Sequence, residues 1–416
     1  MIDPEMVTTS STSNAVKLIY DTDISNDADD VSALAMIHAL VDNGEAELLA
    51  VVTNSNARSD RTASTVDVIN TYYNRPNIPI GVTKVTDLQE DGSWYGHNLY
   101  KMFPQDTPND EQVADAVDVL RATLAAAEDN SISYIQAGYP INMASLLRSE
   151  PDEHSSLNGI DLVRQKVKVV VMMGGQYPHP GTEWNFSRNR PQDTKYVVDT
   201  WPTRMVFAGS EIGWRMYSGT SLQNVPVSNP VRYTYEVFKG FDTPNNAITD
   251  GFHSWDPPAV LWAVRGDQDL WTRINEGFNQ VNDDGSSQWQ TWRDDDRHEY
   301  LVKTQDDSVY IDIFDELYIR PPINIDDSLA IQTESNLVVD PFTGAGSKEL
   351  SLDNNFTVTY SLGLSSQEIS NSLDFSWGVT SSEVSELILN SFSNIEPTIF
   401  GSNMQVIPEI DLIDDI

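Results

Sequence analysis

The stretch that decides the fold is VKLIYDTDISNDADDVSALAMIHALV, residues 16–41. It opens with an apolar run at 16–20 that has the length and β-branched content of a buried strand. It closes with a helix-like run at 31–41, which stops at Asn43-Gly44, a typical helix C-terminal signal. Between the two runs lie five aspartates: Asp21, Asp23, Asp27, Asp29 and Asp30. A strand that passes through an acidic turn into a helix predicts the first half of a strand–helix unit.

The same alternation of strand-like and helix-like runs continues to about residue 219. Apolar runs occur at 48–53, 132–135, 167–173 and 204–207, and residues 110–128 repeat apolar side chains at helical spacing. Continuous apolar strands are typical of a sheet covered by helices on both faces. The sequence therefore predicts an α/β fold with a mainly parallel, doubly wound sheet over residues 15–323.

Two flanking segments differ from this part in composition. Residues 1–14 are mostly polar, and we expect them to be a flexible leader outside the fold. Residues 324–416 are rich in Ser, Asn, Asp and Thr, with alternating runs such as FTVTY at 356–360. We expect a C-terminal β-rich appendage or an acidic tail there.

Charge and cysteine content exclude several classes of function. The 416 residues include 63 Asp and Glu against 25 Lys and Arg, a net charge of −38 at pH 7. A surface this acidic repels nucleic-acid phosphates and anionic lipids, so we expect no nucleic-acid and no membrane partner. No run reaches the ~18 apolar residues of a membrane span. Cysteine is absent, which excludes disulfides and thiolate metal sites.

Polar residues and glycines follow the predicted strands where they end. They are Asp21 and Asp23, Asn54 and Asn56, Gly138, and Gly174-Gly175. The carboxyl ends of strands form the ligand crevice of an open α/β sheet, so we expect these residues to converge there.

The aspartates after the first strand predict a metal site. Packed together as bare anions they would repel one another strongly, and a hard cation with roughly 6–8 oxygen ligands relieves that repulsion. One carboxylate beside the ion could also deprotonate a bound water. We therefore predict Ca²⁺ as the cofactor.

The acidic run has three other interpretations. A solvated turn that caps the following helix stays open, because the N-terminal dipole of a helix favours carboxylates. An EF-hand loop does not fit, since Asn26 stands where that loop needs Gly and Ser32 where it needs Glu. A phosphoryl-transfer site would need a Gly-rich phosphate loop, and the sequence shows none.

Four segments in order resemble the inosine-uridine preferring nucleoside hydrolase family, the nucleoside N-ribohydrolases. DTDISNDADDVSALA at 21–35 resembles the signature DxD(P/x)GxDDAxAL, and VTNSN at 52–56 is similar to a family strand that ends in Asn. MMGG at 172–175 with EWNF at 183–186 resembles MGG…AEFN, and WDPPA at 255–259 resembles (H/W)DPxA. The resemblance spans roughly residues 15–322. It implies a calcium-dependent enzyme that hydrolyses the N-glycosidic bond of nucleosides through an oxocarbenium-like transition state.

The resemblance also implies a role for each matching residue. Asp23 would be the catalytic base that activates water and a metal ligand. The other metal ligands would be Asp30, Asp256 and the carbonyl of Ile141, which stands in a GYPIN turn similar to the family's GPLTN. Substrate contacts would come from Asp29, Asn56, Glu183, Asn185, Asp256 and Trp255.

Two departures from the family pattern stand out. The loop between Asp23 and Asp29 is two residues longer than the shorter family form. Trp255 stands where many members have a His that protonates the leaving base, which favours aromatic stacking on the base; His253 could replace that acid or be structural. Three further side chains are candidates for a lid over the base or for a plain surface loop: Trp94, Tyr95 and His97.

The expected partner is a nucleoside substrate, and a homo-oligomer stays open. The alternatives are a non-catalytic calcium-dependent protein that binds sugars or nucleosides, and a hydrolase of another ribosyl compound. The presence of Asp23, Asp30, Asp256, Glu183 and Asn185 argues against a loss of turnover. A structural calcium module is a third alternative, and it would not need Glu183 and Asn185. The polar leader and the acidic appendage favour a secreted or periplasmic protein over a cytoplasmic one.

Overall fold

The computed structural model describes residues 15–57, 60–107 and 109–323, and three strands after residue 323. The chain divides into two compact units, Met1–Ile323 and Asn324–Ile416. The expected leader, residues 1–14, lies outside the described residues. Among the described residues, no helix combines the length and the apolar character needed to span a membrane.

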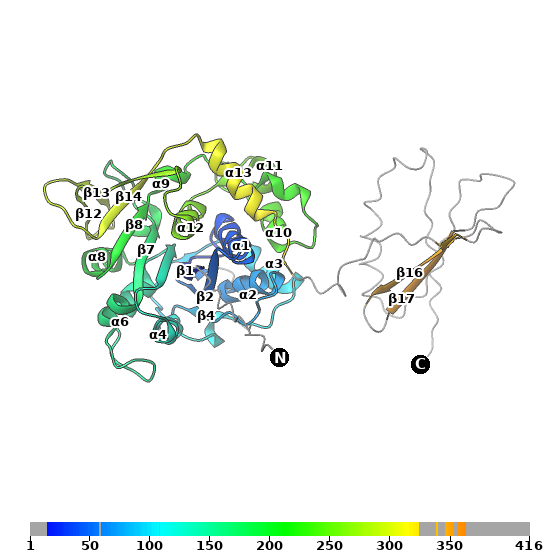
Figure 1. Ribbon diagram of the computed structural model, residues 1–416, viewed down its shortest axis with the longest axis horizontal. Helices are drawn as coiled ribbons and strands as arrows, with labels where there is room; N and C mark the ends of the chain where they lie inside the picture. Colours follow the sequence, from blue (N-terminus) through cyan, green and yellow to red (C-terminus); the bar gives the residue numbers. More distant parts are fainter. Residues whose placement is uncertain are drawn as a thin grey trace, which may run out of the picture. The chain divides into compact units, whose positions relative to one another are not determined.

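An eight-stranded sheet forms the centre of the first unit (Figure 1). From one edge to the other its strands are β4 (Ile80–Val82), β2 (Ala46–Thr53), β1 (Val16–Thr22), β6 (Ile132–Ala137), β7 (Val167–Met173), β8 (Arg204–Ala208), β14 (His298–Lys303) and β11 (Trp271–Ile274). Neighbours from β4 to β14 pair in parallel, and the edge strand β11 runs antiparallel to β14. The mainly parallel, doubly wound sheet predicted from the sequence is confirmed.

The order of the strands reverses beside β1. The chain runs from β1 to β2 and β4 on one side, and then crosses to β6, which pairs with the other side of β1. Ligand crevices in open α/β sheets lie outside the carboxyl ends of the strands at such a reversal. The topology therefore places the end of β1 and its aspartates at the crevice.

Helices cover both faces of the sheet (Figure 1). The cluster of apolar side chains on one face takes in α1 (Asp29–Asp42), α2 (Thr62–Tyr72), α3 (Tyr95–Met102), α10 (Pro230–Val237), α11 (Ala247–Asp250), α12 (Asp256–Arg265) and α13 (Asp307–Tyr318). The cluster on the other takes in α4 (Ala116–Ala126), α5 (Ile141–Leu147), α6 (Gly159–Lys166) and α8 (Pro191–Thr200). β1 supplies both clusters, because Leu18 and Tyr20 belong to the first and Ile19 to the second.

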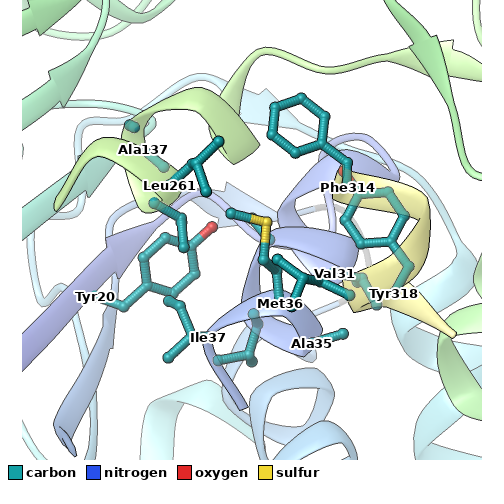
Figure 2. Close-up of a cluster of buried hydrophobic side chains, with 14 of the residues drawn as sticks. Tyr20, Val31, Ala35, Met36, Ile37, Ala137, Leu261, Phe314 and Tyr318 are labelled. Atoms are coloured by element: carbon teal, nitrogen blue, oxygen red, sulfur yellow. The ribbon is translucent and has the colours of Figure 1, made fainter. Parts of the chain in front are cut away.

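Helix α1 is buried from Asp29 to Leu40. It packs against β2, α12 and α13, and Figure 2 shows Met36 of α1 among Tyr20 of β1, Leu261 of α12 and Phe314 of α13. A helix with apolar residues all round is one that neighbours enclose. This burial fixes the start of α1, and with it the two aspartates of its first turn.

Short elements fill the connections of the first unit. They are β3 (Asn56–Ala57) with β5 (Glu90–Asp91), β9 (Tyr217–Ser218) with β10 (Phe252–His253), β12 (Phe278–Val281) with β13 (Ser287–Gln290), and the helical turns α7 (Trp184–Ser187) and α9 (Ser210–Gly213). α7 follows β7 and α9 follows β8, so both lie beyond carboxyl ends of strands.

The second unit contains an antiparallel sheet of β15 (Val338–Val339), β16 (Gly346–Leu352) and β17 (Phe356–Leu362). The rest of the expected appendage, 324–416, lies outside the described residues.

Candidate functional site

Asp21 is the centre of a buried hydrogen-bond network at the end of β1. Its Oδ1 accepts from Asn54 Nδ2 and Asn142 Nδ2, both at 2.9 Å, and its Oδ2 accepts from the Tyr134 hydroxyl at 2.7 Å. Burial raises the pKa of Asp21 to about 7, and the three donors oppose that rise. The network joins β1 to the segment after β2, to β6 and to α5, so Asp21 holds the strand ends together.

Asp23, two residues later, lines a cavity instead. Its backbone N–H donates to Ala137 O at 3.0 Å, and its Oδ2 accepts from Asn26 Nδ2 at 2.8 Å. Gly138 lies directly against it, since a Cβ on Gly138 would stand 2.7 Å from Asp23 Oδ1. The turn after β6 thus fixes the carboxylate from one side.

The N-termini of α1 and α12 meet at this edge of the sheet. Asp29 Oδ2 accepts from the backbone N–H groups of Trp255 at 2.8 Å and Asp256 at 3.1 Å, so Asp29 caps α12. Thr22 Oγ1 donates to Asp30 Oδ1. Carboxylates are favoured here, because both helix dipoles point their positive ends at the site.

Two pairs of carboxyl groups face each other at these helix ends: Asp27 with Asp29, and Asp30 with Asp256. Burial, together with the neighbouring carboxylates, raises the pKa of Asp30 and Asp256 well above the ordinary value. Asp29 Oδ1 and Asp30 Oδ2 are buried and receive no hydrogen bond from other groups in the described part of the chain. Buried carboxylate oxygens without donors are costly, and a hard divalent cation with oxygen ligands such as Ca²⁺ would satisfy them. The residues present therefore fit such an ion.

A second acidic group lies on the surface, where ligand atoms of Asp118, Glu153 and His154 come within 4.8 Å of one another. His154 Nε2 stands 2.9 Å from Asp118 Oδ1, and this ion pair accounts for the approach. No other three His, Asp or Glu side chains are so close within the described residues, so the carboxylates at the strand ends are less tightly gathered.

A cavity of about 490 Å³ opens over the strand ends and has two kinds of wall. Its acidic side chains are Asp23, Asp27, Asp29, Glu183 and Asp256. Its aromatic side chains are Trp184, Trp214, Phe238, Phe241, Phe252 and Trp255. Carboxylates can bind the hydroxyls of a sugar and aromatic rings can stack on a planar ring, so the cavity suits a ligand with both parts.

Glu183 and Asn185 are held rigidly at the start of α7. Glu183 Oε1 accepts from the Asn185 N–H at 2.8 Å, and Oε2 accepts from Gly175 at 3.0 Å and Phe186 at 3.1 Å. Burial raises the pKa of Glu183 to about 7, although these backbone donors oppose the rise. Asn185 Nδ2 donates to Met173 O at 3.3 Å. Both side chains line the cavity.

Four predicted site residues lie away from the cavity lining, and one of them is the predicted metal ligand Asp30, which is fully buried in the first turn of α1. Ile141 is buried in a small cluster with Leu88 and Tyr139, although its turn adjoins Asp23 through Gly138. Trp94 is exposed and His97 half-buried, and neither lines the cavity.

Tyr95, a candidate lid residue, is buried instead. Its hydroxyl accepts from the Ser25 N–H and donates to Asp27 O, both at 2.7 Å, so Tyr95 stabilises the acidic loop. The side chain of Asn56 lies outside the described residues.

His253, the candidate acid, is fully buried beside the cavity and does not line it. Its ring stacks on Trp255 with centroids 4.4 Å apart and planes 13° apart. Trp255 does line the cavity, and its buried indole N–H has no hydrogen-bond partner among the described residues.

Sequence reasoning missed most of the aromatic wall. Ser210 and Trp214 follow the end of β8, so the rule that strand ends form the crevice could have found them. Phe238 and Phe241 come from the connection between α10 and α11, which has no periodicity that points to the cavity.

Comparison with known protein families identifies one family. The family described as inosine-uridine preferring nucleoside hydrolase matches residues 18–313. No curated protein matches the chain. Solved structures with a similar fold include a plant nucleoside hydrolase, at 17% identity over 74% of this chain and 99% of that chain, with a TM-score of 0.55. A purine-preferring ribonucleoside hydrolase from Gardnerella vaginalis has 17% identity over 73% and 98%, with a TM-score of 0.52. A type III effector protein, XopQ, described as complexed with adenosine diphosphate ribose, has 14% identity over 74% and 94%, with a TM-score of 0.54. At these identities the likeness is one of fold.

Proposed function

Since the chain belongs to the inosine-uridine preferring nucleoside hydrolase family, it is a nucleoside hydrolase, and we propose that it uses Ca²⁺ and Asp23 to release ribose and a free base. One observation supports the ion above all. Where the strand order reverses beside β1, Asp29 Oδ1 and Asp30 Oδ2 are buried and receive no hydrogen bond from the described residues, and carboxyl groups face each other in pairs. A bound cation would stabilise this arrangement, because it would compensate the clustered negative charge.

Four groups would hold the ion: the carboxylates of Asp23, Asp30 and Asp256, and the carbonyl of Ile141. When bound, a divalent cation would offset the negative charge of the clustered carboxylates and lower the pKa of a water at the site. Asp30 and Asp256 belong to the N-terminal turns of α1 and α12, two buried helices, so their backbones give the ion a rigid frame.

Asp23 would take a proton from the attacking water while the water oxygen forms a bond to C1′ of the ribose. The C1′–N bond breaks at the same centre, its electron pair leaves with the base, and the base nitrogen takes a proton from solvent water, to which Asp23 in turn gives up the proton that it accepted. Positive charge develops on the sugar ring, and the acidic wall stabilises it. Ribose hydroxyls would be bound by Asp29, Asn56, Glu183, Asn185 and Asp256.

Trp255 would stack on the departing base. Its ring lines the cavity beside Phe252 and Trp214. The aromatic wall gives the base a surface of its own, separate from the carboxylates that meet the sugar.

The decisive experiment is a panel of purine and pyrimidine nucleosides, assayed for free base and free ribose after chelator treatment and again after Ca²⁺ or Mg²⁺ is restored. Adenosine diphosphate ribose belongs in the panel, because one structural neighbour is described with it bound. Ribose release that Ca²⁺ restores supports the proposal, as does about one Ca²⁺ per chain by elemental analysis of protein purified without chelator.

Asp30→Asn should lose both calcium and activity, whereas Asp118→Asn, in the exposed acidic group, should keep both. If calcium-loaded protein binds nucleosides without releasing ribose, the non-catalytic alternative holds. If it cleaves only adenosine diphosphate ribose, the enzyme is a hydrolase of another ribosyl compound.

A further inference from the structure

Both ring nitrogens of His253 are used inside the protein. Nδ1 accepts from the Arg215 backbone N–H at 2.8 Å, so Nδ1 has a lone pair there and the proton is on Nε2. Nε2 stands 2.8 Å from Asp242 Oδ2 and donates to it. The ring is fully buried, and a second proton on it would break the bond to Arg215. The one ring proton of His253 is therefore directed at Asp242 and away from a leaving base.

Asp242 reaches His253 from a different part of the chain. It lies in the connection between α10 and α11, next to Phe241, whereas His253 ends β10. The Tyr217 hydroxyl also donates to Asp242 Oδ2, at 3.0 Å. One carboxylate thus ties the α10–α11 connection to the ring of His253 and to β9.

The buried ring of His253 lies behind the aromatic wall and packs against several of its rings. It lies nearly parallel to Trp255 at 4.4 Å and 13°, to Trp214 at 4.8 Å and 22°, and to Phe241 at 5.7 Å and 16°. Those three rings line the cavity, and Trp214 and Phe241 are 47% and 74% exposed. Rings so exposed have little packing of their own, so contact with a fixed neighbour is what orients them.

We propose that Asp242 and His253 are positioning residues for the base: Asp242 fixes the plane of the buried His253 ring, and that ring holds Trp214, Phe241 and Trp255 in place as a wall for a planar leaving group. This inference rests on the proposed function, because it assumes that the aromatic wall receives a nucleobase. In this proposal His253 acts by positioning Trp255 and does not contact the reacting atoms. The sugar end of the cavity, around Asp23 and Glu183, does not depend on the pair.

The test separates the two ends of the ligand by using the products as inhibitors. Free adenine reports the aromatic wall and free ribose reports the carboxylate wall. In Asp242→Ala the inhibition constant of adenine should rise about tenfold, the loss expected when stacking on a flat wall is disturbed, while that of ribose stays within about twofold. KM for inosine should rise by a similar factor, with kcat changed by less than about threefold.

Three variants control this result. Tyr217→Phe removes the other partner of Asp242 and leaves the pair with His253, so it should behave as wild type. Asp242→Asn keeps an acceptor oxygen for His253 Nε2 and should rescue most of the loss. His253→Phe keeps a flat ring but loses both hydrogen bonds, so it should match Asp242→Ala, and it serves as the test if Asp242→Ala does not fold.

Near-ultraviolet circular dichroism provides a readout that needs no activity. The tryptophan bands between about 280 and 300 nm should change in Asp242→Ala and not in Tyr217→Phe, because only the first frees the stacked indoles. Equal shifts in the inhibition constants of adenine and ribose would overturn the proposal, as would unchanged adenine binding with an unchanged spectrum. If wild type cleaves no nucleoside, the proposed function fails, while the spectrum and direct adenine binding still decide on the pair.

Discussion

Substituting Ala for Gly138 places a methyl group against Asp23, the proposed general base. Gly138 follows β6 with φ +116°, and a Cβ there would lie 2.7 Å from Asn54 Oδ1, from Asp23 N and from Asp23 Oδ1. None of these atoms can move cheaply. Asn54 is fixed between Asp21 and the Tyr139 N–H, and Asp23 N donates to the end of β6.

Two costs add up in Gly138→Ala. A side chain in the left-handed region costs roughly 1–2 kcal/mol, and overpacking a closed site costs about 1–3 kcal/mol more. The free energy of unfolding should therefore fall by about 2–5 kcal/mol. A shift of the Asp23 carboxylate approaching 1 Å costs on the order of 100-fold in rate, so kcat should fall by about 10- to 100-fold.

Gly44→Ala is the matched control. Gly44 also has a positive φ, +74°, but a Cβ there meets nothing within 4 Å. It should lose only the ~1–2 kcal/mol of backbone strain and keep its kcat. Urea unfolding and ribose release, measured on both variants, give the comparison. A Gly138→Ala protein as stable as Gly44→Ala and with wild-type kcat would refute the reasoning.

Four further predictions follow from the site. Asp23→Asn should lower kcat by about 10²–10⁴-fold with a much smaller rise in KM, and near-normal turnover would place water activation elsewhere. Burial raises the pKa of Glu183 to about 7, so kcat/KM should fall as the pH drops below about 7 and the carboxyl gains a proton; Glu183→Gln should abolish this acidic limb, and a limb that persists would belong to another group. Trp255→Ala should raise KM for purine nucleosides more than for pyrimidine ones, because the larger ring loses more contact, and equal losses would mean that Trp255 only packs the wall. Truncation after Asn324 should leave ribose release per folded molecule intact, whereas a folded truncation that binds calcium without turnover would make the second unit part of the active site.

The sequence by itself determined the fold class and the place of the site. Apolar runs of strand length alternate with helical periodicity, and these are local properties that a chain displays before it folds. The aspartates stand directly after the first strand, so the parallel sheet had to bring them to its carboxyl edge. The helix-like run at 31–41 has no polar face, and α1 is accordingly enclosed on all sides.

Only the tertiary structure decided which carboxylate is enclosed in a hydrogen-bond network and which one lines the cavity. Asp21 and Asp23 look equivalent in the sequence, yet Asp21 is bound by Tyr134, Asn54 and Asn142, and Asp23 lines the cavity. Those donors come from segments far along the chain, and their arrival at Asp21 depends on how the strands are ordered. No local pattern encodes that order.

The base side of the cavity was decided by the tertiary structure as well. Trp214 comes from the connection after β8, Phe241 from the connection between α10 and α11, and Trp255 from the residue before α12. From the sequence, His253 could be an acid or a structural residue. In the fold, Asp242 and the Arg215 N–H reach its two ring nitrogens, and these contacts place the ring proton on Nε2 and orient the ring. Connections follow no period, so the meeting of their side chains is set by packing across the whole domain and can be read only after the chain has folded.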